Sequence, residues 1–396
     1  MDIAKRLVTP EHRPISCIEM QTTGEPTRIV FEGYPDLSGT LLEQRAEAKA
    51  KHDHLRRRLM LEPRGHFDMY GAVLRPETEL TKSGEAHVGV LFMTNDGYST
   101  MCGHATIALG RFLLDTHDLN VFPCRNDIKH DPETKTAIVN LHNPSGLLKV
   151  TVPVNNDGSA SDPSRPVSFI SVPSFATGID VKISLPPARQ WRGLEGRSKD
   201  IRVDFSYGGA FFCIVSSREL GFSDELKTKD LDQLDKATAL LKAHINSDLA
   251  LSKYFRHPEH DDLGFLYSVI VVDDSRNVPG SEVGLCFFSN QQIDRSPTGG
   301  GVAARAALAY AKGDRKLNES WEYHSLVSAA GYGPAFKGTV VEVLAEKYPE
   351  IHGPLVRIKG EGYAFYTGFS TYAVETKDPL GDDGFVFKDC QPVTGG

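Results

Sequence analysis

The stretch that decides the fold is residues 97–115, GYSTMCGHATIALGRFLLD, in which a glycine-containing turn leads into a helix-length segment that is apolar on nearly all sides. A helix that is hydrophobic all round is buried, so in a soluble protein it runs through the middle of a domain. Residues 294–310, DRSPTGGGVAARAALAY, have the same character. The sequence therefore predicts one central helix in each half of the chain.

Cys102 and Thr298 stand at the starts of these two predicted helices. Each is followed by glycine, and about half of the 396 residues separate them. This placement indicates a duplicated architecture. Coincidence between two glycine-rich turns is the alternative, because the rest of the two halves shows no clear identity by eye.

Strands dominate the regions around the two helices. Short β-rich segments punctuated by Gly and Pro lie at residues 26–34, 68–75, 148–154, 167–175, 201–216 and 264–273. Charged helical stretches at 41–59 and 224–245 are typical of surface helices, and the spacing of leucines in the second suits one buried face. Residues 185–198 carry Pro, Gly and charge between two strand-like regions, so we place a domain junction near residue 198.

Composition restricts the class of protein. Lys and Arg number 44 against 52 Asp and Glu, a net charge of −8, which argues against a basic nucleic-acid binder. There is no run of about 18 apolar residues, and the first ten residues lack the apolar stretch of a signal peptide, so we expect a cytoplasmic protein that does not bind membranes. The six cysteines include no Cys-x-x-Cys pair and are interpreted as free thiols.

The two helix starts carry the candidate chemistry. A helix N-terminus leaves N–H groups unpaired and has a partial positive charge, so two of them facing one cleft can bind a small carboxylate. Glycines at 103, 299, 300 and 301 let a ligand approach the backbone, although flexible turns are the simpler explanation. A thiol in this position, that of Cys102, is expected to have a lowered pKa and to act as a base or a nucleophile.

Two polar residues close to the helix starts have open roles. His104 can hydrogen-bond the substrate or help to carry a proton, but it can equally be a structural donor. Asp294 can cap the second helix, or it can pair with an ammonium group beside a bound carboxylate. A ligand with an amine next to a carboxylate is an amino acid.

On these residues the sequence resembles the proline racemase family, which includes hydroxyproline 2-epimerases and trans-3-hydroxy-L-proline dehydratases. The resemblance rests on MCGH at 101–104 and DRSPTG at 294–299 and covers almost the whole chain. Further matching blocks are GEPTRIV at 24–30, LEPRGHFDMYG at 61–71, SVPSF at 171–175, YGG at 207–209 and DLGFLY at 262–267.

The resemblance implies an α/β (α+β) fold of the diaminopimelate-epimerase-like type. In it, two pseudo-symmetric halves each wrap a mostly antiparallel sheet around a central buried helix. The expected organisation is a first half at residues 1–198 that carries Cys102, a second half at 199–365 that carries Asp294 and Thr298, and a C-terminal segment at 366–396 that returns to the first half. The resemblance also implies a site that needs neither a cofactor nor a metal.

Family roles carry over to the matching residues. Cys102 matches the first catalytic cysteine, and Gly103 and His104 match the residues beside it that hold substrate. Asp294 matches the carboxylate that meets the ring amine. Gly299 and Gly300 fall where backbone N–H groups hold the substrate carboxylate.

Thr298 departs from the racemases and epimerases of the family, which have a second cysteine at this place, and matches the dehydratase branch, which has threonine. Racemisation without a cofactor needs an acid and a base on opposite faces of Cα. A threonine hydroxyl is far too weak an acid for that exchange. The expected reaction is therefore dehydration of trans-3-hydroxy-L-proline to Δ1-pyrroline-2-carboxylate by a hydro-lyase in which Cys102 abstracts the α proton.

Other local departures bear on substrate preference. Family members often have His and Glu where this chain has Thr94 and Asp96, and an Asp-x-His run where it has EMQ at 19–21. Gly300 stands where Ser or Thr is common. These differences put the choice among proline analogues in doubt more than the type of reaction.

Several alternatives remain open from sequence alone. A hydroxyproline 2-epimerase or proline racemase is the closest, followed by a cysteine hydrolase using Cys102 and by a non-catalytic amino-acid-binding protein. Metal binding is not expected, because the histidines at 52, 54 and 66 lack zinc spacing with a third ligand. The expected partner is a small hydroxyproline-like imino acid, not nucleic acid, and a homodimer is one open assembly.

Overall fold

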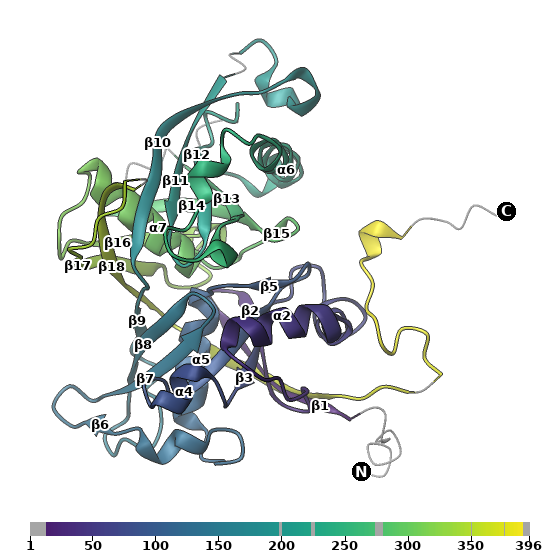
Figure 1. Cartoon of the computed structure of the whole chain (residues 1–396), viewed down its shortest axis with the longest axis vertical. Coiled ribbons are helices and arrows are strands. Elements are labelled where there is room, and N and C mark those ends of the chain that lie inside the picture. Colours follow the sequence, from purple (N-terminus) through teal and green to yellow (C-terminus); the bar gives the residue numbers. More distant parts are fainter. Residues whose placement is uncertain are drawn as a thin grey trace.

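The computed structural model describes residues 13–197, 200–222, 226–273, 280–349, 351–375 and 377–390. The domain junction predicted near residue 198 lies outside the described residues. The chain has a mixed α/β fold, with strands arranged around two helices (Figure 1).

One series of strands surrounds the first central helix. It consists of β1 (Ile15–Thr22), β2 (Glu25–Glu32), β3 (Gly71–Arg75), β4 (Val88–Met93), β7 (Thr136–Asn143), β8 (Gly146–Pro153), β9 (Val167–Ile170) and β19 (Phe365–Tyr372), with the short strands β5 (Tyr98–Ser99) and β6 (His130–Asp131). Pairing is antiparallel except in β2–β3 and β4–β7. β1 lies between β2 and β19, where Ile18 pairs with Ile29 on one side and Phe369 on the other.

The strands of a second series, around the second central helix, pair one after another until the last strand pairs with the first. It consists of β10 (Ser174–Ser184), β11 (Asp200–Tyr207), β12 (Phe211–Ser216), β13 (Leu266–Val272), β14 (Ser281–Phe288), β15 (Gln292–Ile293), β16 (Ser320–His324), β17 (Phe336–Val343) and β18 (His352–Gly362). β18 pairs with β17, β10 and β9, so it closes this series and joins it to the first. Most pairs are antiparallel, and β12–β13 and β14–β16 are parallel.

The two helices predicted from the apolar stretches are present. α5 (Gly103–Asp115) packs against β1, β2, β7, β8 and β9, and α7 (Gly299–Lys312) packs against β10, β11, β17 and β18. Nearly every residue of α5 is buried, because strands cover it on all sides. The start of each helix lies where the two series of strands meet, and α5 and α7 contact each other there.

The charged stretches form surface helices whose ends differ from the prediction. The stretch at 41–59 is divided at His52 into α2 (Leu41–Lys51) and α3 (Asp53–Met60), and the later one begins at Leu231, as α6 (Leu231–Ser247). The expected leucine face of α6 is confirmed, since Leu234 and Leu241 are buried and Leu231 is partly buried against the same cluster. The shorter helices are α4 (Glu79–Ser83) and α8 (Leu326–Ala329).

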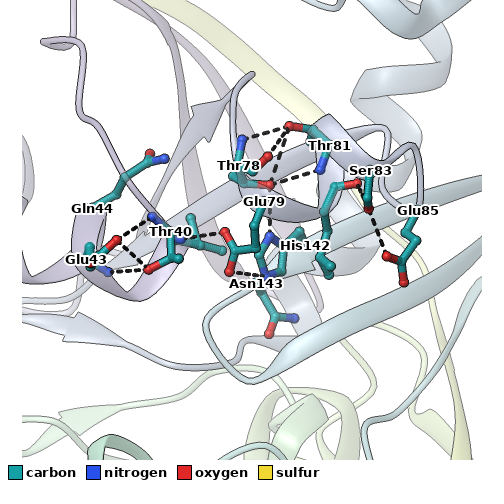
Figure 2. Close-up of polar contacts among 12 residues, drawn as sticks. Thr40, Glu43, Gln44, Thr78, Glu79, Thr81, Ser83, Glu85, His142 and Asn143 are labelled. Atoms are coloured by element: carbon teal, nitrogen blue, oxygen red, sulfur yellow. Dashed lines mark hydrogen bonds and ion pairs between the residues drawn. The ribbon is translucent and has the colours of Figure 1, made fainter.

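Figure 2 shows how hydrogen bonds at their first turns join α2 to α4 and α4 to strand β7. Thr40 and Thr78 each form a capping box at the start of α2 and α4. Glu79 accepts a hydrogen bond from the backbone N–H of Leu41, 2.8 Å, which joins α4 to α2. His142 of β7 lies 2.9 Å from the Thr78 hydroxyl and so fixes α4 on the strand beneath it.

The C-terminal segment lies against the strands around α5. After β19 pairs with β1, the chain forms an isolated bridge between Phe385 and Glu62. Arg58 of α3 donates to Asp382 at 2.7 Å. Within the described ranges, no helix is long and apolar enough to cross a membrane.

Candidate active site

The two helix starts meet in the interior. Cys102 is the N-cap of α5 and Thr298 is the N-cap of α7. A Cβ atom added to Gly103 would lie 2.3 Å from the Cα of Gly299, and one added to Gly299 would lie 2.4 Å from the Cα of Gly103. These two glycines are therefore needed for backbone-to-backbone contact between the helices. The contact brings the unpaired N–H groups of both first turns into one place.

A small pocket lies at this junction, with about 290 Å³ of space between its lining atoms when open solvent is included. Its lining residues are Tyr70, Met101, Cys102, Gly103, His104, Phe212, Tyr267, Phe288, Asp294, Thr298, Gly299 and Gly300. All seven residues to which the family resemblance gave a role are in this set, whereas Gly301 is not. The mixture of apolar walls with a few polar groups suits a small organic molecule.

Cys102 faces two hydrogen-bonding neighbours from its own helix. Its Sγ accepts from the backbone N–H of Ala105 at 3.3 Å and lies 3.2 Å from Nδ1 of His104. The expectation of a lowered thiol pKa is wrong for this structure. Burial raises the pKa of Cys102 well above its usual value, and the hydrogen bonds from Ala105 and Tyr70 offset this only in part. Only 6% of Cys102 is exposed, so desolvation outweighs the helix dipole.

His104 is held as a neutral imidazole. Burial lowers its pKa to about 3, although a hydrogen bond to the Pro26 carbonyl favours the charged form. The hydroxyl of Thr22 donates to the backbone carbonyl of His104, 3.1 Å. The end of β1 thus holds the backbone of His104, and Pro26 of β2 holds its ring. A neutral ring can donate or accept a hydrogen bond, but it is a poor proton donor near neutral pH.

Asp294 and Thr298 form one hydrogen-bonded unit. The Thr298 hydroxyl donates to Oδ2 of Asp294 at 2.7 Å, and the backbone N–H of Ser296 donates to Oδ1 at 2.7 Å. Asp294 is thus not the cap of α7, which starts at Thr298 without a side-chain cap. Burial raises the pKa of Asp294 to about 6, against the lowering effect of these hydrogen bonds. Thr298 has a φ of 65°, a conformation that non-glycine residues seldom adopt.

Sequence reasoning missed the aromatic wall and one carboxyl. Tyr70 and Tyr267 line the cavity; Tyr70 is the last but one residue of the block LEPRGHFDMYG, and Tyr267 is the last of DLGFLY. Glu25 from GEPTRIV is fully buried and accepts from the backbone N–H of Arg295 at 2.7 Å. Burial and the charge of Asp294 raise the pKa of Glu25 well above its usual value. The blocks were visible in the sequence, but nothing in them indicated which side chains face the site.

The described part of the chain brings no three His, Cys, Asp or Glu side chains together as a metal ion would need. The rings of His52 and His54 are 6.3 Å apart, and the neighbouring Asp53 pairs with Arg56 at 2.6 Å. The polar side chains at the helix junction include those of Cys102, His104, Asp294 and Thr298.

Known proteins are similar in sequence to this chain over most of its length. The proline racemase family model matches residues 17–386. This chain belongs to the proline racemase family. Among its family relatives, the trans-3-hydroxy-L-proline dehydratase of Homo sapiens is 40% identical over 385 residues, 96% of this chain and 97% of the relative. The proline racemase of Acetoanaerobium sticklandii is 32% identical over 367 residues, 92% of this chain and 96% of the relative.

A solved structure of the proline racemase family has the same fold. The probable proline racemase from Agrobacterium radiobacter K84 superposes with a TM-score of 0.76 at 23% identity, covering 95% of this chain and 97% of that one. At this identity the likeness concerns the mixed α/β fold alone. The family thus accounts for the overall arrangement, and the chemistry has to be argued from the residues in the cavity.

Proposed function

We propose that the chain is a cofactor-independent hydro-lyase that converts trans-3-hydroxy-L-proline to Δ1-pyrroline-2-carboxylate. The observation that carries the proposal is the asymmetry of the cavity. Among the described residues that line it, Cys102 is the only thiol, and Thr298 stands at the other helix start. The greater similarity to the human dehydratase than to the bacterial racemase supports the same choice.

Thr298 is unsuited to be the second acid or base of a racemase. Inversion at Cα needs a group on each face that exchanges a proton near neutral pH. The hydroxyl hydrogen of Thr298 is already donated to Asp294. In this role, threonine orients the carboxylate for the ring amine and leaves no proton acceptor on its face of the substrate.

β-Elimination can proceed from one face. In trans-3-hydroxy-L-proline the hydroxyl lies on the same ring face as the α hydrogen, because both are opposite the carboxylate. Cys102 as thiolate takes the α proton, the electron pair of the Cα–H bond forms the Cα–C3 double bond, and the C3–O bond breaks. The Cys102 thiol then gives its proton to the departing oxygen, and water and an enamine leave. The enamine tautomerises to Δ1-pyrroline-2-carboxylate.

The surrounding groups favour this step. N–H groups at the starts of α5 and α7 stabilise the negative charge that grows on the carboxylate as Cα loses its proton. Asp294 binds the ring ammonium. That positive charge near Cys102 lowers the pKa of the thiol and opposes the effect of burial, so substrate binding itself promotes the thiolate. His104, neutral and 3.2 Å from Sγ, orients the thiol or the substrate and is not the acid of the proposal.

The alternative is a hydroxyproline 2-epimerase or proline racemase with an unusual second base. Cys286 is the thiol to consider, because the Thr298 hydroxyl lowers its pKa against the larger raising effect of burial. Burial raises the pKa of Cys286 to about 12, and Cys286 is not among the described residues that line the cavity. The observations therefore favour elimination.

The remaining expectations form part of this proposal. The two regions that carry Cys102 and Thr298 are interpreted as related halves of a diaminopimelate-epimerase-like fold, each with its own central helix. The substrate is a small imino acid, held by residues at positions 103, 104, 294, 299 and 300. A homodimer remains a candidate assembly.

The test is an NMR assay in D2O with purified protein and no added cofactor. Trans-3-hydroxy-L-proline, trans-4-hydroxy-L-proline and L-proline are supplied separately. We expect loss of the 3-hydroxy compound to Δ1-pyrroline-2-carboxylate without inversion of the other two. Inversion of either one would replace the dehydratase with the epimerase assignment, and binding without α-hydrogen exchange would indicate a non-catalytic protein. Cys102→Ser should abolish turnover, and near-normal activity would contradict the role of the thiol.

A further inference from the structure

Tyr70 lines the same pocket as the proposed base, Cys102. It lies just before β3 and is almost completely buried. Its phenol lowers the pKa of the Cys102 thiol. Its ring meets that of His104 edge-on with centroids 4.6 Å apart, and Nδ1 of His104 lies 3.2 Å from Sγ of Cys102. A second contact joins the phenol to the hydroxyl of Ser99, 2.6 Å away. Neither Tyr70 nor Ser99 has a role in the mechanism above.

Ser99 links Tyr70 to a second tyrosine of the cavity wall. Tyr267, at the start of β13, lines the same pocket, and the hydroxyl of Ser99 lowers the pKa of its phenol. Each hydroxyl in the row Tyr267, Ser99, Tyr70 has one hydrogen to donate. When Ser99 gives its hydrogen to the Tyr70 oxygen, the phenol hydrogen of Tyr70 is free to point at the sulfur. Hydrogen bonds aligned in this way polarise and strengthen one another.

We propose that Tyr70 is a further catalytic residue, whose phenol donates a hydrogen bond to Sγ of Cys102 and holds it as thiolate, with Ser99 and Tyr267 aligned behind it. This inference rests on the function proposed above, in which the thiolate removes the α proton. The phenol keeps its own proton throughout. The α proton moves to Sγ, and Tyr70 then donates a weaker hydrogen bond to the neutral thiol.

The charges around Cys102 explain why such a donor is needed. Two carboxyl groups, those of Asp294 and Glu25, oppose a negative charge on the sulfur, and burial opposes it more strongly. Against these act the backbone N–H of Ala105 and the phenol of Tyr70. His104 is neutral and adds no positive charge, and Tyr267 faces the same pocket with its own proton in place, because burial raises its pKa well above the usual value. Tyr70 is thus the side-chain donor positioned to favour the thiolate.

The test uses Tyr70→Phe in the full-length protein, which removes one oxygen and keeps the ring against His104. The profile of kcat/KM for trans-3-hydroxy-L-proline against pH is measured together with the rate of Cys102 alkylation by iodoacetamide. Mass spectrometry of the Cys102 peptide separates this rate from that of the exposed Cys390. Tyr332→Phe, at a side chain that is 85% exposed, is the matched control.

Loss of a hydrogen bond to a charged group predicts a fall in kcat/KM of about 10- to 100-fold for Tyr70→Phe at neutral pH. Since only the thiolate reacts, the rise of both kcat/KM and Cys102 alkylation with pH should move about one to two pH units higher. Cys390 alkylation and the Tyr332→Phe profile should not move. Ser99→Ala should shift the Cys102 profile in the same direction by a smaller amount.

Unchanged pH profiles in Tyr70→Phe, with kcat/KM within threefold of the native enzyme, would overturn the proposal. A lower kcat without a shift in pH profile would also overturn it, since it would mean a structural role only. If Tyr70→Phe fails to fold, the shift in Ser99→Ala decides the question. Failure of the proposed function is distinguishable, because the native enzyme would then leave trans-3-hydroxy-L-proline unchanged.

Discussion

Replacing Gly103 with alanine tests whether the contact between the two helix starts is required for catalysis. The added methyl carbon would lie 2.3 Å from the Cα of Gly299 and 2.9 Å from its carbonyl carbon. Ordinary contact begins at 3.4 Å, so the methyl group is about 1.1 Å too close to backbone atoms that have no rotamer to change. The starts of α5 and α7 must therefore separate by about 1 Å.

The separation of the helix starts should lower both the stability of the fold and the rate of the reaction. Overpacking a tight interior costs about 1–3 kcal/mol of the free energy of unfolding. A misplacement of about 1 Å between groups that act on one substrate can cost about 100-fold in rate. We expect Gly103→Ala to remain folded at 25 °C with a lower unfolding midpoint and to lose about 100-fold in kcat/KM for trans-3-hydroxy-L-proline.

The assay combines urea unfolding with initial rates on protein shown to be folded. Gly97→Ala is the matched control, because Gly97 lies in the same approach to Cys102 and a Cβ there would meet nothing within 4 Å. The reasoning is refuted if Gly103→Ala keeps more than a third of the native kcat/KM at an unchanged unfolding midpoint. It is also refuted if Gly97→Ala loses as much activity.

Further predictions concern Thr298, Asp294 and His104. Thr298→Cys should introduce α-hydrogen exchange with inversion, measured by NMR in D2O, and no inversion at all would count against the two-face argument. Since Asp294 must be charged to meet the ring amine and its pKa is about 6, kcat/KM should fall as the pH drops through about 6. Thr298→Val removes a hydrogen bond that lowers this pKa, so the acidic limb should move to higher pH; a shift to lower pH would contradict the assigned contact. The pKa of His104 falls from 6.5 to about 3 on folding, because the buried ring stays neutral. Below pH 6.5 the unfolded chain takes up a proton that the folded chain does not. The free energy of unfolding should therefore be unaffected above pH 6.5 and lower by about 2 kcal/mol at pH 5. Urea unfolding of His104→Asn at pH 7 and pH 5 should show a correspondingly smaller loss, and an equal loss would disprove the assignment.

Local patterns determined the helices and the membership of the site. The apolar runs after Cys102 and Thr298 predicted two buried helices, because only a helix enclosed by other elements can be apolar all round. The identities of Cys102 and Thr298 also determined the type of chemistry to consider, since a thiol and a hydroxyl differ greatly in acidity. The start of α6 at Leu231 and the break at His52 were less visible, because helix ends depend on caps and neighbours as much as on composition.

The glycines after Cys102 and Thr298 show what a pattern leaves open. From sequence they were expected to admit a ligand to the backbone. In the structure Gly103 and Gly299 lie against each other, although both also line the cavity. The pairing of β19 with β1, more than 340 residues apart, has no local signature at all.

The sequence by itself thus determined that two buried helices begin at a thiol and a hydroxyl, and which polar residues accompany them. Only the tertiary structure decided the electrostatic state of these groups. The helix start favours a thiolate at Cys102, yet the pKa is raised, because strands and aromatic rings from distant parts of the chain exclude water from the sulfur. Tyr70, 32 residues before Cys102, joins the site for the same reason. Desolvation depends on everything that packs around an atom, and no local stretch of sequence contains that information.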